Sequence, residues 1–154
     1  MPIVNHLLYL FALCLVATMS AAEPSDNGVT PVYQVRPIGW VRKVDGKTTI
    51  EVERQYEPAL LGVEELADIW VLYWFDRNDT VERRAILQVH PRGNPKNPLR
   101  GVFATRAPVR PNLIAISRCR VLSIAGGVIA IDDIDAFPDT PVLDIKPIDP
   151  RSDR

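Results

Sequence analysis

R-G-N-P-K-N-P-L-R-G-V-F-A-T-R-A-P-V-R-P, residues 92–111, is the stretch around which the rest of the chain is arranged. It mixes basic residues with prolines and glycines around one short apolar run, Val102 to Ala104. Proline fixes φ and cannot donate a ladder hydrogen bond, so the stretch is predicted to be two stiff loops around a short strand. Between Pro91 and Arg120 there are seven Lys or Arg residues and no acidic one, although the formal net charge of the chain is −1. Arginines on a stiff loop are well suited to hold a carboxylate or a phosphate.

The sequence around this stretch predicts a mainly β protein. The chain has 154 residues, the length of about one domain. Its 14 prolines disfavour a helical bundle. Tyr56 to Asp68 is the one helical pattern, broken at Gly62. We expect hairpin turns at Val44–Lys47 and Ala125–Gly127. The short strands at this spacing predict a small antiparallel β-barrel with one short helix. The predicted strands are Val32–Val41 with a bulge at Pro37–Gly39, Thr48–Val52, Ile69–Phe75, Arg84–His90, Gly101–Thr105, Leu113–Ile124, Val128–Ile134 and Pro141–Ile145.

The aromatic run Ile69–Phe75 is predicted to be buried on both faces, with Trp70, Tyr73 and Trp74 in the core.

The N-terminal 22 residues resemble a secretory signal peptide. Leu7 to Ala17 is apolar throughout, and Ser20-Ala21-Ala22 supplies small residues before a cleavage point. We expect cleavage after Ala22, a flexible leader over 23–31, a barrel domain over 32–150 and a tail over 151–154. The cleaved protein would be secreted or periplasmic and would keep no stable membrane span. The alternatives are a buried N-terminal helix or an uncleaved anchor, in a cytoplasmic or membrane-anchored protein.

Common catalytic motifs are absent from the sequence. It contains no P-loop, no H-E-x-x-H and no C-x-x-C, so no metal site is expected. His90 precedes a proline and is interpreted as structural or substrate-touching rather than as a general base. Cys119 alternates with arginines in a strand and is interpreted as a core residue rather than a nucleophile.

An acidic block follows the predicted hairpin at Ala125–Gly127, which brings it close to the basic stretch. Two interpretations stay open. The blocks could pair with each other as solvated faces, which stabilises little and is favoured on charge alone. They could instead form a site for a zwitterion, with arginine holding a carboxylate and an acidic or carbonyl oxygen facing a cation. The block comprises Asp132, Asp133, Asp135, Asp139, Asp144 and Asp149.

Two runs, G-V-F-A-T-R-A-P-V-R-P-N (Gly101–Asn112) and T-P-V-L-D-I-K-P (Thr140–Pro147), resemble the TsaA-like family, which includes the TrmO-type tRNA methyltransferases. Weaker support comes from Pro37–Gly39, Leu61–Leu66 and His90–Gly93. The resemblance implies a small β-barrel that forms a homodimer and binds S-adenosyl-L-methionine. The members of the family that act on tRNA methylate N6 of a threonylcarbamoyl-modified adenosine beside the anticodon. It also implies tRNA as a partner, bound through the basic face from Arg92 to Arg120.

The resemblance also implies a cofactor site, whereas no catalytic residue is identified. Arg106 and Arg110 would hold the cofactor carboxylate or an RNA phosphate, and Asp144 and Lys146 would hold the last strand in place. Methyl transfer from a sulfonium mostly needs alignment of donor and acceptor, so scarce His and Cys are no objection. The residues implied to bind the cofactor are Arg106, Pro108, Arg110, Pro111, Asn112, Ile116, Ala136, Phe137, Pro138 and Asp139.

The chain departs from the family at one of these residues, Asp139, and at several other positions. The family usually has glycine where Asp139 stands, and a longer first loop with a Pro-Arg-Gln motif in place of Val44–Lys47. Other departures are Ala107 for serine, Leu113 for proline, Ala115 for glycine and Ile148 for an aromatic residue.

The predicted function is therefore an S-adenosyl-L-methionine-dependent methyltransferase, with tRNA as the implied substrate. The alternative is an exported ligand-binding or structural barrel that keeps the fold but not methyl transfer. A third hypothesis, a nucleic-acid-binding module without catalysis, is disfavoured by the pI of about 6.1.

Overall fold

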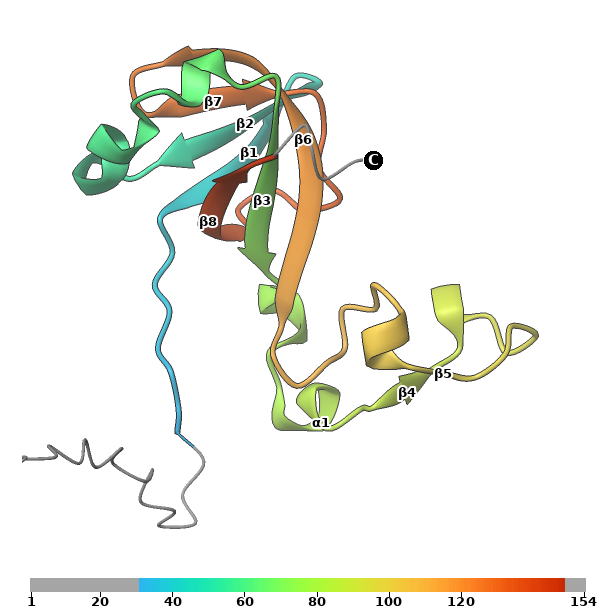
Figure 1. The fold of residues 1–154 in the computed structure, drawn as a ribbon. Helices are drawn as coiled ribbons and strands as arrows, with labels where there is room; N and C mark the ends of the chain where they lie inside the picture. Colours follow the sequence, from blue (N-terminus) through green and yellow to red (C-terminus); the bar gives the residue numbers. More distant parts are fainter. Residues whose placement is uncertain (1–30, 149–154) are drawn as a thin grey trace, which may run out of the picture. The chain divides into compact units, whose positions relative to one another are not determined.

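The structure, a computed structural model, describes residues 31–148. Its centre is a closed barrel with the strand order β1-β2-β7-β6-β3-β8, in which all neighbouring strands are antiparallel (Figure 1). The predicted mainly β fold is confirmed. The predicted signal peptide, most of the leader and the 151–154 tail lie outside the described residues. The barrel strands are β1 (Gly39–Val44), β2 (Lys47–Val52), β3 (Asp68–Trp74), β6 (Ile114–Ala125), β7 (Val128–Ile131) and β8 (Pro141–Pro147).

Side chains that alternate along the strands fill the barrel interior. On β3, Ile69, Val71 and Tyr73 are buried, whereas the residues between them are only half-buried. The prediction that this strand is buried on both faces is therefore wrong for one face, and Trp70 and Trp74 are not core residues. A single closed sheet has only one interior, so the other face of each strand points outward. The largest fully buried side chains of the barrel core include Val41, Ile50, Ile69, Val71, Ile129 and Val142.

The first strand begins later than predicted. Residues 31–38 are not in a strand, and β1 starts at Gly39, after Pro37. Gly39 allows β1 and β2 to approach closely, because a Cβ there would lie 2.4 Å from the carbonyl oxygen of Glu51. The predicted turn after β1 is confirmed, with positive φ at Asp45 (49°) and Gly46 (73°).

Two 3₁₀ helices, η1 (Arg54–Leu60) and η2 (Val63–Glu65), connect β2 to β3. The break predicted at Gly62 is present, with φ at 87°, but the turns are 3₁₀ rather than α-helical. Within residues 31–148, no helix is both long enough and apolar enough to cross a membrane.

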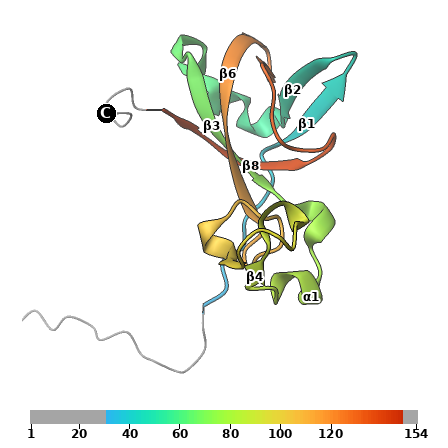
Figure 2. The same cartoon turned by 90° about the vertical axis from the view of Figure 1, so that its right-hand side faces the viewer.

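The chain leaves the barrel between β3 and β6 in a segment of residues 75–113, called the β3–β6 extension from here on (Figure 1, Figure 2). Its β4 (Gln88–Val89) and β5 (Arg100–Gly101) pair only with each other. Its remaining elements are η3 (Asp76–Asn78), α1 (Val81–Arg84), η4 (Pro91–Gly93) and η5 (Val102–Ala104).

The strands predicted at Arg84–His90 and Gly101–Thr105 are therefore wrong for most of their length. Of the residues in these two ranges, only Gln88, Val89 and Gly101 are in strands, and Val102–Ala104 form the 3₁₀ helix η5. Arg84 itself ends α1, which begins after Thr80, whose hydroxyl accepts a hydrogen bond from the backbone N–H of Arg83 (3.2 Å).

The last three barrel strands agree with the prediction more closely. The predicted long strand at Leu113–Ile124 is found as β6, one residue later. β7 ends at Ile131 rather than at Ile134, and residues 132–140 form a loop, called the β7–β8 loop below, before β8 begins. The acidic residues of this loop explain the early end, because charged side chains disfavour a paired strand.

Candidate functional site

A pocket of about 920 Å³ lies where β3 and β6 leave the barrel. This volume is within the range of about 300–1,000 Å³ typical of small-molecule sites. Four segments line the pocket: the end of β3 and the residues after it, the start of β6, part of the β3–β6 extension near Arg106, and the β7–β8 loop. Lys43 from β1 also reaches it.

Tyr73 connects the barrel core to the β7–β8 loop. Its ring is buried, and its hydroxyl donates a hydrogen bond to the carbonyl oxygen of Asp135 (2.7 Å). The Oγ of Ser117 lies 3.2 Å from the same hydroxyl. Burial raises the pKa of Tyr73, so the phenol remains protonated and keeps its donor at neutral pH.

Lys43 holds the first part of the same loop. Its Nζ donates to the carbonyl oxygen of Ile134 (2.7 Å) and lies 3.1 Å from an Asp133 carboxylate oxygen. The backbone N–H of Ile134, together with Lys43, lowers the pKa of Asp133. The Asp133 carboxylate therefore stays ionised at neutral pH.

Basic side chains also line the pocket. Arg106, from the β3–β6 extension, donates through Nη2 to the carbonyl oxygen of Ile116 on β6. Arg77 places its guanidinium 4.0 Å from the centre of the Phe137 ring, a cation–π contact between η3 and the β7–β8 loop. These contacts join segments that are far apart in the sequence at one pocket.

The charges around the pocket have both signs. Arg77, Arg106 and Arg110 lie in the same lining as Asp133 and Asp135. Arginines can hold a carboxylate, and carboxylates and carbonyl oxygens can face a cation. Charges of both signs in one lining are compatible with the zwitterion interpretation.

The pocket brings together six of the ten residues predicted to bind a cofactor: Arg106, Pro108, Arg110, Ile116, Ala136 and Phe137. Pro111, Asn112, Pro138 and Asp139 are not among the residues that line it. The backbone of two of these supports the neighbouring structure. The carbonyl oxygen of Pro111 accepts from Arg84 (2.8 Å), and that of Asn112 accepts from the N–H of Ile114 (2.7 Å).

Sequence analysis missed the lining that comes from the end of β3. The run from Tyr73 to Asn78 lies in the pocket, and its signal was available, because F-D-R-N directly follows an aromatic strand. Lys43 also lines the pocket. No local pattern identifies Lys43, because it lies far from the other lining residues in sequence and arrives only through strand pairing.

Other candidate residues have structural contacts away from the pocket. His90 places its Nδ1 2.7 Å from the carbonyl oxygen of Asn97, inside the β3–β6 extension. Cys119 is fully buried in the barrel core, and burial raises its pKa to about 12. Lys146 pairs with Asp144 on β8 (2.7 Å). Across residues 31–148, no three His, Cys, Asp or Glu side chains form a group that could hold a metal ion.

The fold and the pocket define a class: a small closed antiparallel barrel that carries a pocket of small-molecule size, lined by charges of both signs, where one long extension leaves it. The profile of the tRNA-methyltransferase O N-terminal domain matches residues 30–154. The chain belongs to this family, which confirms the resemblance found in its sequence.

Named relatives of the chain agree with this family assignment. The chain is 44% identical over 115 residues, covering 75% of its length, to a Methanocaldococcus jannaschii protein named "Probable S-adenosyl-L-methionine-binding protein", of which it covers 91%. It is 40% identical over 91 residues to the human tRNA (adenine(37)-N6)-methyltransferase, covering 59% of this chain and 20% of the enzyme.

Solved structures also match. The crystal structure of TrmO from Pseudomonas aeruginosa aligns with a TM-score of 0.61 and 28% identity, covering 80% of this chain and 58% of that one. The chain therefore spans about three-fifths of this TrmO and a fifth of the human enzyme.

Proposed function

We propose that the protein is an S-adenosyl-L-methionine-dependent methyltransferase that holds its cofactor in the pocket between the Arg106 region and the β7–β8 loop. The observation that carries the proposal is the meeting of these two segments at one pocket of suitable size. It is supported by membership of a methyltransferase family and by relatives named for binding this cofactor or for methylating adenine in tRNA.

The residues present fit this cofactor. S-adenosyl-L-methionine combines a carboxylate, an amine, an adenine ring and a sulfonium that carries the transferable methyl group. Arg106 and Arg110 would hold the carboxylate, and the ionised Asp133 would face the positive groups. Phe137 and Ile116 offer exposed apolar surface for the adenine, with 59% and 43% of their area accessible. These roles need positioning and exclusion of water more than a strong base.

We propose tRNA as the methyl acceptor, bound by the basic face from Arg92 to Arg120. Six of the seven basic residues in this range are exposed, and Arg110 is half-buried. They run from the β3–β6 extension past the pocket to β6, which would place RNA phosphates beside the cofactor. Such binding should weaken steeply as salt is raised, because each phosphate contact releases counterions.

We also propose that the protein is a homodimer formed through the β3–β6 extension. Leu87, Leu99 and Phe103 in this segment are 59%, 52% and 79% exposed, and a shallow groove lies beside Leu87 and Phe103. A two-stranded sheet is marginally stable by itself, so apolar surface from a second copy would stabilise it. Light scattering after gel filtration should give the dimer mass for the wild type and the monomer mass for Phe103→Asp.

The enzymatic proposal is tested by methyl transfer. Purified protein is incubated with cofactor carrying a labelled methyl group and with total tRNA, and N6-methylated nucleosides are measured by mass spectrometry. We expect label in a modified adenosine with the wild type and much less with Arg106→Ala. Folded protein that binds the cofactor but transfers no label to tRNA would remove the tRNA substrate and leave the cofactor site.

A further inference from the structure

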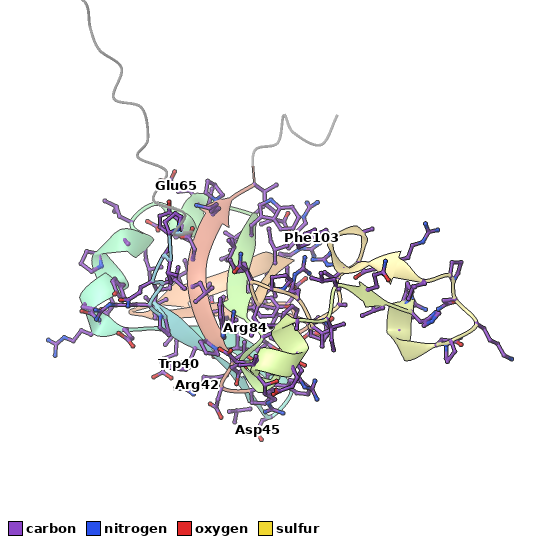
Figure 3. All side chains as sticks on the ribbon, turned by 90° about the horizontal axis from the view of Figure 1, so that it is seen from below. Trp40, Arg42, Asp45, Glu65, Arg84 and Phe103 are labelled. Carbon is purple, nitrogen blue, oxygen red and sulfur yellow. The ribbon has the colours of Figure 1, made fainter. Side chains whose placement is uncertain are left out.

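The β7–β8 loop is held at both ends by two consecutive residues of β1. Lys43 binds its first part through the carbonyl oxygen of Ile134 and the Asp133 carboxylate. Arg42 binds its last part, because its Nη1 donates to the Asp139 carboxylate. Consecutive strand residues point to opposite faces, so the loop is held from both sides of β1. Figure 3 shows Arg42 beside Trp40 on this strand.

Asp139 has an unusual backbone conformation for a residue with a side chain. Its φ is +64°, in the left-handed region that favours glycine, although Asp tolerates it better than most residues. Its N–H donates to the carbonyl oxygen of Val41 on β1 (2.8 Å). The next residue, Thr140, is buried and lines the pocket. The left-handed turn therefore fixes the point where the pocket wall joins the barrel.

Arg42 is itself held in position. Its Nε donates to the Glu51 carboxylate on β2 (2.8 Å), across from β1 in the sheet. The hydrogen bond to Glu51, with that to Asp139, raises the pKa of Arg42. Arg42 is not among the residues lining the pocket, so any effect on a ligand must pass through Asp139 and the loop.

We propose that Arg42 is a positioning residue, which holds Asp139 in the left-handed turn and thereby fixes Ala136 and Phe137 in the pocket wall. A glycine at position 139 would adopt the left-handed conformation without a side-chain contact. In this chain, the ion pair with Arg42 stabilises that conformation at Asp139. The inference rests on the proposed function only in that the pocket ligand used to test it is S-adenosyl-L-methionine.

An exposed ion pair commonly contributes little to global stability, and the proposal agrees with this. It places the effect of Arg42 in the local geometry of residues 136–140 and not in the free energy of unfolding. If the ion pair were merely structural, its removal would change neither the exchange of these amides nor the ligand affinity by more than its effect on stability explains.

The test combines Arg42→Gln, Asp139→Gly and the double variant, with Glu51→Gln as the matched control that keeps the Arg42–Asp139 contact. Cofactor affinity is measured by calorimetry, global stability by thermal unfolding, and amide exchange of residues 133–140 by mass spectrometry. We expect Arg42→Gln to weaken cofactor affinity about tenfold and to speed amide exchange in the loop, because residues in contact are energetically coupled. Its melting temperature should change little.

The double variant decides the inference. Glycine adopts the left-handed conformation without a side-chain anchor, so in the Asp139→Gly background the Arg42 change should cost no more than about twofold in affinity. Glu51→Gln keeps a side-chain oxygen that can accept the hydrogen bond from Nε of Arg42, so Arg42 stays in place and the variant should behave like the wild type. Equal losses from Arg42→Gln in both backgrounds, or unchanged exchange in the single variant, would overturn the inference. Amide exchange needs no ligand, so wild-type protein that gives no binding heat removes the proposed function while this readout still decides the role of Arg42.

Discussion

The barrel and the β3–β6 extension are built on different principles. In the barrel, six strands pair along their length and fill one interior with branched apolar side chains such as Ile50, Ile69 and Ile129. In the extension, the regular elements are two to four residues long and leave Leu99 and Phe103 exposed. The largest buried apolar cluster therefore belongs to the barrel, whereas the extension supplies part of the pocket lining and the surface that we propose for partners.

The largest expected effect of a single substitution is on the barrel. Ile129→Ala removes a fully buried side chain from the core and should lower the free energy of unfolding by about 3 kcal/mol. Val81→Ala truncates a side chain of the extension that is 80% exposed and lies outside the surface that we propose for the dimer, and it should change this free energy by less than about 0.5 kcal/mol. Denaturant unfolding of both variants measures the contrast, and equal losses would show that the extension is part of the same cooperative core.

A second prediction concerns the pocket wall that the extension supplies. Arg106→Ala removes the guanidinium that bonds to Ile116 and that we assign to the cofactor carboxylate. Affinity for S-adenosyl-L-methionine should fall by about 2 kcal/mol, or roughly thirtyfold, with little change in stability. Arg92→Ala, an exposed arginine of the same extension that does not line the pocket, is the control. Similar losses from both variants would mean that overall charge, and not this wall, governs binding.

A smaller effect is expected at Tyr73, which belongs to the barrel and also holds the β7–β8 loop. Tyr73→Phe keeps the buried ring but removes the hydrogen bond to the carbonyl oxygen of Asp135. The free energy of unfolding should fall by about 1 kcal/mol, measured by denaturant unfolding. Ser117→Ala, which removes the other partner of the hydroxyl, should cost less because the bond to Asp135 remains. A larger loss from Ser117→Ala would show that the loop does not depend on Tyr73.

The smallest effect is expected at Cys119. Its pKa of about 12 means that at pH 8 on the order of one thiol in ten thousand is ionised, and the side chain is fully buried. A Cys14→Ser background leaves this thiol as the single cysteine of the chain. Ellman's reagent should react with it only after denaturation. Rapid reaction of the folded protein would show that the barrel opens at β6.

The two regions also differ in how far the sequence predicts them. β6 and the hairpin after it follow from a local apolar alternation that ends at Gly126 and Gly127, and the prediction was correct within one residue at the start of the strand. In the extension, apolar residues at Arg84–His90 favoured a strand, but only Gln88 and Val89 form one, and Arg84 belongs to α1. Proline-rich turns lack a periodic pattern, so sequence periodicity could not locate these elements.

The residues around the pocket also differ in how far the sequence predicts them. Arg106 belongs to a run with a recognisable motif, and Phe137 lies just before the second such run. Both were predicted to bind the cofactor, and both line the pocket. Lys43 and the Arg42–Asp139 contact arise only when β1 is placed beside the β7–β8 loop, about ninety residues away in sequence. Asp139 was noted as a departure from the family's glycine, but its partner could be identified only from the fold.

The central claim is that the Arg106 region and the β7–β8 loop together form a site for S-adenosyl-L-methionine. Titration calorimetry of the full chain with this cofactor tests it most directly. We predict saturable binding to one site per chain, with a dissociation constant on the order of 10 μM, which corresponds to roughly −7 kcal/mol. Folded protein that gives no binding heat with millimolar cofactor would contradict the account.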